Sequence, residues 1–211
     1  MSHPKYNFLV TALQGLRGGT FLECGAFDGE TASNTLPLEY EYGWSGYLIE
    51  PNPYYYTQIV GKNRNVTSLN ACISVETTDT LLNLPVKCPD NKGGGCVQRS
   101  SMTSETNENT IRVPCFTFTS IMNAYNIQSI DYFSLDVEGA ELAVLKTIPF
   151  DKIDIKSLSV EYVHTPGGEE SITDFLKSKN YVLLEHIHFS DKVRKLFVDD
   201  LIFIKDDLVV E

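Results

Sequence analysis

Short apolar runs alternate with amphipathic segments along most of this chain, and this alternation limits its fold more than any other feature. The runs have the length of buried strands, and the segments between them have the apolar spacing of helices. Strands that alternate with helices pack as a mostly parallel sheet with helices on both faces. The expected strands lie at 20–24, 46–50, 66–74, 130–136 and 157–162, and the expected helices at 30–42, 53–60, 119–125, 139–147 and 171–179.

The end of the chain departs from this alternation. Strands at 181–187 and 201–205 follow each other without a helix between them, which predicts an antiparallel hairpin at one edge of the sheet. The stretch at about 76–112 has weak periodicity, and we interpret it as a long insertion with one hairpin, either a functional lid or a tolerated surface loop. We therefore expect a single α/β domain over residues 1–211 with a Rossmann-like, mostly parallel, seven-stranded sheet.

The segment ECGAFDG at 23–29 lies where the first strand meets the following helical stretch. Glycines at this place let the backbone turn tightly and approach a ligand closely. The pattern E-x-G-x-x-x-G differs from the dinucleotide fingerprint G-x-G-x-x-G. We interpret it as a cofactor-binding turn, although a glycine turn that serves packing alone is the alternative; its candidate residues are Glu23, Gly25, Ala26 and Gly29.

An acidic residue, Glu50, ends the second strand, and Pro51 and the residues after it fix the chain just beyond. A carboxylate at this position accepts hydrogen bonds from the ribose hydroxyls of an adenosine cofactor. A solvated charge at the end of a strand is the alternative explanation. With the glycine turn, Glu50 and Pro51 predict an adenosine site that would suit NAD as well as S-adenosylmethionine.

The string DVEGAE at 136–141 separates these two cofactors. Its three carboxylates follow the fourth strand, at the edge where open α/β sheets bind ligands. Such a cluster is stabilised by a cation, and S-adenosylmethionine carries a sulfonium and an ammonium, whereas a dinucleotide pyrophosphate would be repelled. An acidic first helical turn would explain Glu138 and Glu141 well, but it explains Asp136, which is still in the strand, less well.

Three strings of the chain occur in the order that a known family shows, namely FLECGAFDGET at 21–31, IEPNP at 49–53 and DVEGAE at 136–141. Together they resemble the FkbM family of S-adenosylmethionine-dependent methyltransferases over roughly residues 19–205. Residues 33–36 and 43–46 are similar to the animal Star-like branch. The resemblance implies a class I methyltransferase fold, S-adenosylmethionine as cofactor, and methyl transfer to a hydroxyl of a sugar or other small metabolite.

The resemblance also implies roles for single residues. It implies that Glu23, Gly25 and Gly29 shape the cofactor loop and that Glu50 holds the ribose. Many bacterial members carry Asp where Glu23 stands, and Glu should do the same work with a longer reach. Some Star-like members are trafficking proteins without an established enzymatic role, so a non-catalytic interaction module with this fold is a rival function.

Methyl transfer to oxygen requires groups that align the hydroxyl and remove its proton. We nominate Asp136 as general base or substrate orienter, and expect Glu161 and His164 at the same sheet edge. Histidine side chains suit base chemistry near neutral pH, although a surface-loop histidine is the alternative for His164. The same three residues would also suit Mg²⁺ or Mn²⁺, which we keep as a lesser alternative while assigning no metal ligand.

The formal net charge of −11 argues against a nucleic-acid partner, because phosphate-binding proteins usually carry a basic face. Ribose 2′-O-methyltransferases acting on RNA usually use a Lys-Asp-Lys-Glu set, and Asp136 and Glu161 could be its acids. Lys146, however, follows Asp136 too soon for the usual second lysine. We therefore expect a small-molecule or glycan acceptor and keep RNA methylation as a rival function.

Neither a signal-peptide pattern nor an apolar run of membrane-spanning length is visible, so we expect a cytoplasmic protein without a membrane span. The five cysteines form no C-x-x-C pair, which argues against a structural zinc site. Cys88 and Cys96 bracket a glycine-rich loop that a disulfide could close in an oxidising compartment. Free thiols in a reducing cytoplasm are the alternative.

Overall fold

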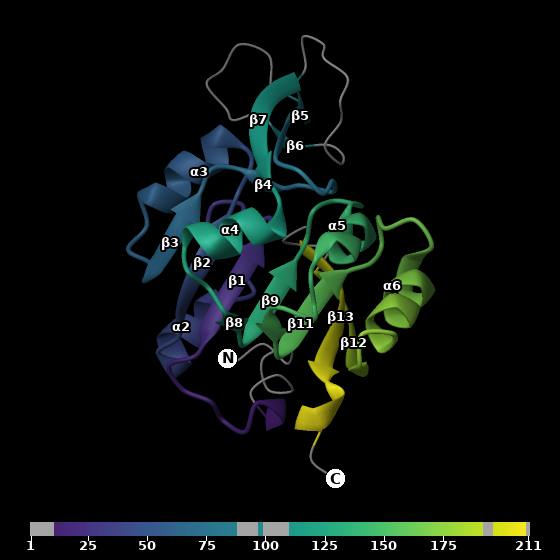
Figure 1. Ribbon diagram of the computed structural model, residues 1–211. Helices are drawn as coiled ribbons and strands as arrows, with labels where there is room; N and C mark the ends of the chain where they lie inside the picture. Colours follow the sequence, from purple (N-terminus) through teal and green to yellow (C-terminus); the bar gives the residue numbers. More distant parts are fainter. Residues whose placement is uncertain (1–10, 88–96, 99–109, 192–195, 210–211) are drawn as a thin grey trace.

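The computed structural model describes residues 11–87, 97–98, 110–191 and 196–209. Seven of the described strands form a central sheet: β1 (Thr20–Cys24), β2 (Ser45–Ile49), β3 (Val66–Leu69), β9 (Tyr132–Leu135), β11 (Ser157–Glu161), β12 (Tyr181–Asp191) and β13 (Leu196–Lys205). Their order is β12-β13-β11-β9-β1-β2-β3 (Figure 1). Strand β13 is antiparallel to both of its neighbours, and the other strand pairs of this central sheet are parallel. The expected fold class is thus confirmed.

Helices cover both faces of this sheet (Figure 1). On one face lie α2 (Leu36–Tyr42) and α3 (Pro53–Val60), and on the other lie α4 (Phe118–Ala124), α5 (Glu141–Thr147) and α6 (Gly168–Lys177). Side chains alternate between the two faces along a strand, so Phe21 of β1 packs with α2 and α3 while Leu22 packs with α4 and α5. Two hydrophobic cores therefore hold the sheet rigidly from both sides.

A smaller sheet lies beyond the carboxyl ends of the central strands (Figure 1). Its strands, in spatial order, are β4 (Cys72–Ile73), β7 (Thr110–Phe116), β5 (Thr80–Lys87) and β6 (Val97–Gln98). It has a small core of its own, formed by Cys72, Leu84, Val113 and Cys115. The remaining described elements are the strand pair β8 (Ser129–Ile130) and β10 (Asp154–Ile155) and the 3₁₀ helix η1 (Asp206–Leu208).

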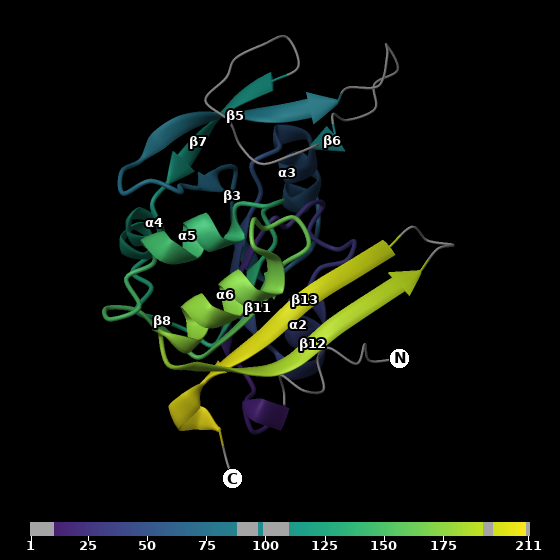
Figure 2. The same cartoon turned by 90° about the vertical axis from the view of Figure 1, so that its right-hand side faces the viewer.

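Several expected elements have different bounds in the structure, and among them the strand expected at 130–136 is divided into β8 and β9. The helix expected at 30–42 begins only at Leu36, because residues 33–35 fold back onto a buried carboxylate described below. The strand expected at 66–74 splits into β3 and β4. Helix α6 begins at Gly168 instead of Ser171, whose hydroxyl donates to the Gly168 carbonyl. The closing hairpin is longer than expected at 181–187 and 201–205 (Figure 2).

Most of the described part of the expected insertion at 76–112 is strand, with β5 antiparallel to β7, and residues 76–79 form a bend before β5. Cys72 of β4 and Cys115 of β7 form a disulfide that the sequence analysis did not anticipate. Cys88 and Cys96 lie outside the described residues, so a bond between them stays a prediction. None of the described helices has the length and apolar character that a membrane crossing requires.

Candidate active site

The turn after β1 requires glycine at position 25. Gly25 has a φ of +81°, which L side chains rarely adopt, and its N–H donates to the Ile49 carbonyl at 3.0 Å. A Cβ on Gly25 would lie 1.8 Å from the carbonyl oxygen of Asp136 at the end of β9. The absence of a side chain therefore lets the turn lie directly against β9.

Glu50 follows β2 and is buried beside this turn, with 4% of its surface exposed. One carboxylate oxygen accepts the Phe27 N–H and the other accepts the Asn52 N–H, each at 2.8 Å. The Asn70 amide donates to the Glu50 carbonyl, also at 2.8 Å. Burial raises the pKa of Glu50 to about 7, against the lowering effect of the two backbone hydrogen bonds.

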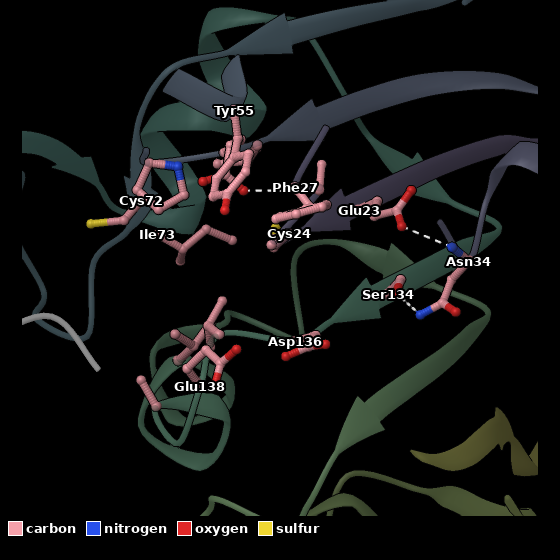
Figure 3. A pocket seen from close by; sticks show the side chains of 18 of the residues that line it. Glu23, Cys24, Phe27, Asn34, Tyr55, Cys72, Ile73, Ser134, Asp136 and Glu138 are labelled. Carbon is pink, nitrogen blue, oxygen red and sulfur yellow. Dashed lines mark hydrogen bonds between the residues drawn. The ribbon is translucent and has the colours of Figure 1, made fainter. Parts of the chain in front are cut away.

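A cavity of about 360 Å³ opens at the carboxyl ends of β1, β2 and β9, and we name it the apolar cavity (Figure 3). Phe27 and Tyr55 form part of its wall, with ring centroids 4.0 Å apart. Ile73 and Leu82 add apolar surface from the smaller sheet. Apolar walls with a few fixed polar groups are typical of cofactor and small-molecule sites.

Glu23, at the end of β1, organises the loop that borders this cavity. Its carboxylate accepts hydrogen bonds from the Ser33 hydroxyl and the Asn34 N–H at 2.8 Å, and from the Thr35 hydroxyl. The Asn34 side chain in turn donates to the Ser134 hydroxyl on β9 at 2.8 Å (Figure 3). These bonds replace helical ones, which explains why α2 begins late.

A second cavity, of about 400 Å³, adjoins the apolar cavity, and we name it the acidic cavity. Asp136 and Glu138 line both cavities, as do Ala32 and Asn34. His164 is the single basic side chain among the described residues that line the acidic cavity. The carboxylates that line it belong to Asp136, Glu138, Glu161, Asp199 and Asp200.

The carboxylates of this cavity perturb one another. Asp136 is exposed to solvent in the open cavity, but the surrounding protein still desolvates its carboxylate. This desolvation, followed by repulsion from Asp200 and three further carboxylates, raises the pKa of Asp136 well above its usual range. Burial and the neighbouring Glu141 raise the pKa of Glu161 to about 7. His164, whose side chain is 59% exposed, lies with Nδ1 3.1 Å from Oε1 of Glu161 and 3.7 Å from Glu138.

Glu141 is fully buried beneath this cavity and holds the turn between β9 and α5. One of its oxygens accepts the Val137 and Gly139 N–H groups at 2.8 and 3.1 Å, and the other accepts the Thr165 hydroxyl at 2.5 Å. Glu138 and Gly139 both have positive φ in this turn. Helix α5 therefore begins at Glu141, two residues later than the sequence pattern indicated.

The structure brings most of the predicted site residues together. The apolar cavity is lined by the predicted cofactor residues Glu23, Gly25, Ala26, Glu50, Pro51 and Asp136. The acidic cavity is lined by the predicted catalytic residues Asp136, Glu161 and His164. Gly29 is placed differently: a Cβ there would lie 3.2 Å from Ile59 of α3, so Gly29 serves helix packing.

Sequence reasoning missed several residues that line the two cavities. Asn34 lies between the cavities, and Tyr55 closes the wall of the apolar one. Asp199 and Asp200 come from β13, at the far end of the chain. The consecutive acids within a strand were a visible signal, but only the register of β13 against β11 places them in the site.

The strand order, the glycine turn after β1 and the acid after β2 are those of a Rossmann-like domain with a site for an adenosine cofactor. A family model described as the methyltransferase FkbM domain matches residues 23–183, so the chain belongs to the FkbM methyltransferase family. The resemblance seen in the sequence is confirmed. No curated protein matches the chain significantly.

Solved structures show the same fold. The methyltransferase FkbM from Methylobacillus flagellatus, known from a crystal structure, has 13% sequence identity to this chain, and the two structures superpose with a TM-score of 0.56 over 89% of this chain. This chain spans 43% of the length of that protein. The magnesium protoporphyrin IX methyltransferase from Synechocystis, solved with bound S-adenosylmethionine, is 9% identical, with a TM-score of 0.50 over 95% of this chain and 77% of its own.

Proposed function

We propose that this chain transfers a methyl group from S-adenosylmethionine to a hydroxyl oxygen of a sugar or other small metabolite. The observation that carries the proposal is the wall that the two cavities share. Asp136 and Glu138 line both of them, so a donor in the apolar cavity would adjoin an acceptor in the acidic cavity. Methyl transfer requires this kind of contact between two bound reactants.

The apolar cavity fits the proposed cofactor. Each Glu50 oxygen holds one backbone N–H and keeps a lone pair, so the carboxylate can accept both ribose hydroxyls. The rings of Phe27 and Tyr55 offer a surface for adenine, and Gly25 leaves the space that a Cβ would fill. When bound, S-adenosylmethionine supplies a methyl group that its positively charged sulfur makes electrophilic.

The acidic cavity offers the groups that handle the acceptor. Nδ1 of His164 lies 3.1 Å from Oε1 of Glu161, so with Nδ1 carrying the proton toward Glu161, Nε2 would offer a lone pair and act as general base. Nε2 of His164 would take the proton that the acceptor hydroxyl gives up when it is methylated. Glu161 stabilises the resulting imidazolium, and Asp136 orients the acceptor between the cavities.

The rival function on RNA has less support. Neither lysine nor arginine occurs among the described residues that line the two cavities, so phosphate groups would meet only negative charge there. Lys146 lies in the last turn of α5, is exposed and lines neither cavity. A non-catalytic interaction module that does not bind the cofactor would not need the buried and partnered Glu50 carboxylate.

The test is methyl transfer from S-adenosylmethionine with a labelled methyl group to separate panels of sugars and glycans, small hydroxylated metabolites, RNA and proteins. We expect label in a small molecule or glycan, and a methyl ether in the NMR spectrum of the product. Label only in RNA or on nitrogen would contradict the proposal. Cofactor binding without transfer to any panel would favour the interaction module.

A further inference from the structure

The acidic cavity places like charges directly opposite each other. In the antiparallel pair β11–β13, Glu161 is the register partner of Asp200. Both residues are buried, with 8% and 5% of their surfaces exposed. Opposed like charges on neighbouring strands destabilise a sheet, and low solvent exposure strengthens the repulsion. Positive charge bound at Glu161 would relieve this repulsion.

One carboxylate oxygen in this cluster, Oε2 of Glu161, has no hydrogen-bond partner among the described residues. Oε1 of Glu161 faces His164, but Oε2 is shielded from solvent and forms no hydrogen bond with any described residue. A buried carboxylate oxygen without a partner is costly, and native proteins contain few such atoms. An ion that the protein binds is one of the standard explanations for such an atom.

The carboxylates also converge on a point. One oxygen each from Asp136, Glu141 and Glu161 lie within 4.8 Å of one another. Oxygen ligands on opposite sides of a Mg²⁺ ion are about 4.2 Å apart, and on opposite sides of Ca²⁺ about 5 Å. The three oxygens thus have the spacing of ligands around one hard cation. Because the donors are carboxylates alone, this set favours Mg²⁺, Mn²⁺ or Ca²⁺ over thiol-seeking metals.

We propose that Asp136, Glu141 and Glu161 bind a divalent cation of the Mg²⁺ or Mn²⁺ type, with Oε2 of Glu161 among its ligands. The outer contacts of these side chains suit that task. Thr165 donates to Glu141 and His164 lies against Glu161, so these two carboxylates are held in orientation. The sequence analysis considered Asp136, Glu161 and His164 as metal ligands; in the structure, Glu141 takes the place of His164 in this set.

The cation site also narrows the acceptor class, and this step rests on the proposed function. A hard cation at the shared wall of the cavities would bind oxygen atoms of the acceptor. It therefore favours an acceptor with two neighbouring hydroxyl groups, such as a sugar diol. A cationic acceptor is the competing occupant, but an organic ammonium is too large to reach an oxygen that is almost entirely shielded from solvent.

Manganese provides a direct test, because free Mn²⁺ has a strong electron paramagnetic resonance signal that binding reduces. We would titrate chelator-treated protein with Mn²⁺ and expect one bound ion per chain, displaced by Mg²⁺. Glu161→Gln should weaken Mn²⁺ binding at least about 10-fold. Glu169→Gln is the matched control, since Glu169 pairs with His186 outside the cluster and should leave binding unchanged.

Asp136→Asn provides a second variant with the same expectation if Glu161→Gln fails to fold, which circular dichroism would show. The proposal is overturned if the wild type holds no Mn²⁺ at millimolar concentration, or if both variants bind it as the wild type does. Binding of spermine without binding of Mn²⁺ would also overturn it, in favour of a cationic acceptor.

Calorimetry with S-adenosylmethionine on the same samples separates this inference from the proposed function. Cofactor binding without Mn²⁺ binding removes the metal site and leaves methyl transfer standing. Mn²⁺ binding without cofactor binding supports the metal site and contradicts the proposed function.

Discussion

The two cavities treat their buried carboxylates in opposite ways. In the apolar cavity, both oxygens of Glu50 accept backbone N–H groups, and both oxygens of Glu23 accept hydrogen bonds from the loop at 33–35. In the acidic cavity, Glu161 keeps a buried oxygen without a described partner and faces Asp200. The first site is therefore organised by the protein alone, whereas the second is completed by what it binds. Substitutions in the apolar cavity should therefore change cofactor affinity, and substitutions in the acidic cavity should change turnover or cation binding.

The largest expected effect lies in the acidic cavity. His164→Asn removes the proposed base, and turnover with the acceptor found by the panel assay should fall by about 100-fold to 10,000-fold. Affinity for S-adenosylmethionine should stay within about 3-fold, because His164 does not line the apolar cavity. Steady-state kinetics and calorimetry would measure the two quantities. Unchanged turnover would remove His164 from the mechanism.

The next largest effect is expected at Gly25 in the apolar cavity. In Gly25→Ala the new Cβ would collide with the Asp136 carbonyl, so cofactor affinity should fall by at least about 100-fold, or 2.7 kcal/mol. Gly43→Ala is the matched control: Gly43 has a similar φ of +70°, but no described atom lies within 4 Å of its Cβ position. Equal losses of affinity in the two variants would show that backbone strain, and not the close approach, is responsible.

Glu50→Gln should have a smaller effect on the same binding. It removes the charge that would face the ribose, and hydrogen bonds to charged groups contribute about 1.5–3 kcal/mol, so affinity should fall about 10-fold to 100-fold. Mn²⁺ binding should not change. The exposed Glu170 provides a control for loss of one negative charge. If Glu50→Gln bound the cofactor normally in calorimetry, the ribose would lie elsewhere.

The raised pKa of Glu50 predicts a pH dependence. Because the ionised carboxylate is the better acceptor, cofactor affinity should fall about 10-fold from pH 8 to pH 6, through the pKa of about 7. In the free protein the sign is opposite: a raised carboxyl pKa favours folding at low pH, and this contribution is lost as pH rises through 7. The pH dependence of cofactor affinity measured for Glu50→Gln would show the part that comes from ionisation of the cofactor. If the wild type had the same pH dependence, Glu50 would not be its cause.

The smallest effect on binding is expected for the disulfide between Cys72 and Cys115. Replacing both residues by Ala should lower the unfolding free energy by about 2–4 kcal/mol, because the bond closes a long loop. Cofactor affinity should change only a few-fold, although Cys72 lines the apolar cavity. Denaturant melts with and without reductant would measure the stability. Free thiols in protein isolated under alkylating conditions would agree with the expected cytoplasmic location.

Features that depend on local sequence could be predicted. The turn at Gly25, the acid Glu50 and the start of α3 at Pro53 each follow from a few adjacent residues, and the structure has them where expected. The start of α2 could not be predicted in this way. Ser33 and its neighbours hydrogen-bond to Glu23, ten residues earlier, and this contact outweighs their helical pattern.

Features that depend on pairing between distant segments were also missed. Asp200 enters the acidic cavity only because β13 runs antiparallel to β11 in one register. Cys72 and Cys115 meet through the parallel pair β4–β7, although they are 43 positions apart in sequence. The convergence of Asp136, Glu141 and Glu161 likewise needs two strands and the turn after β9. A sequence gives the residue types of such sites, but strand register gives their distances.

The central claim is that the apolar cavity binds S-adenosylmethionine independently of the acidic cavity. The most direct test is a calorimetric titration of the cofactor into the wild type, Glu50→Gln and Glu161→Gln. We predict one site per chain, weakened about 10-fold to 100-fold in Glu50→Gln and changed less than about 3-fold in Glu161→Gln. Absence of binding by the wild type, or equal weakening in both variants, would contradict the account.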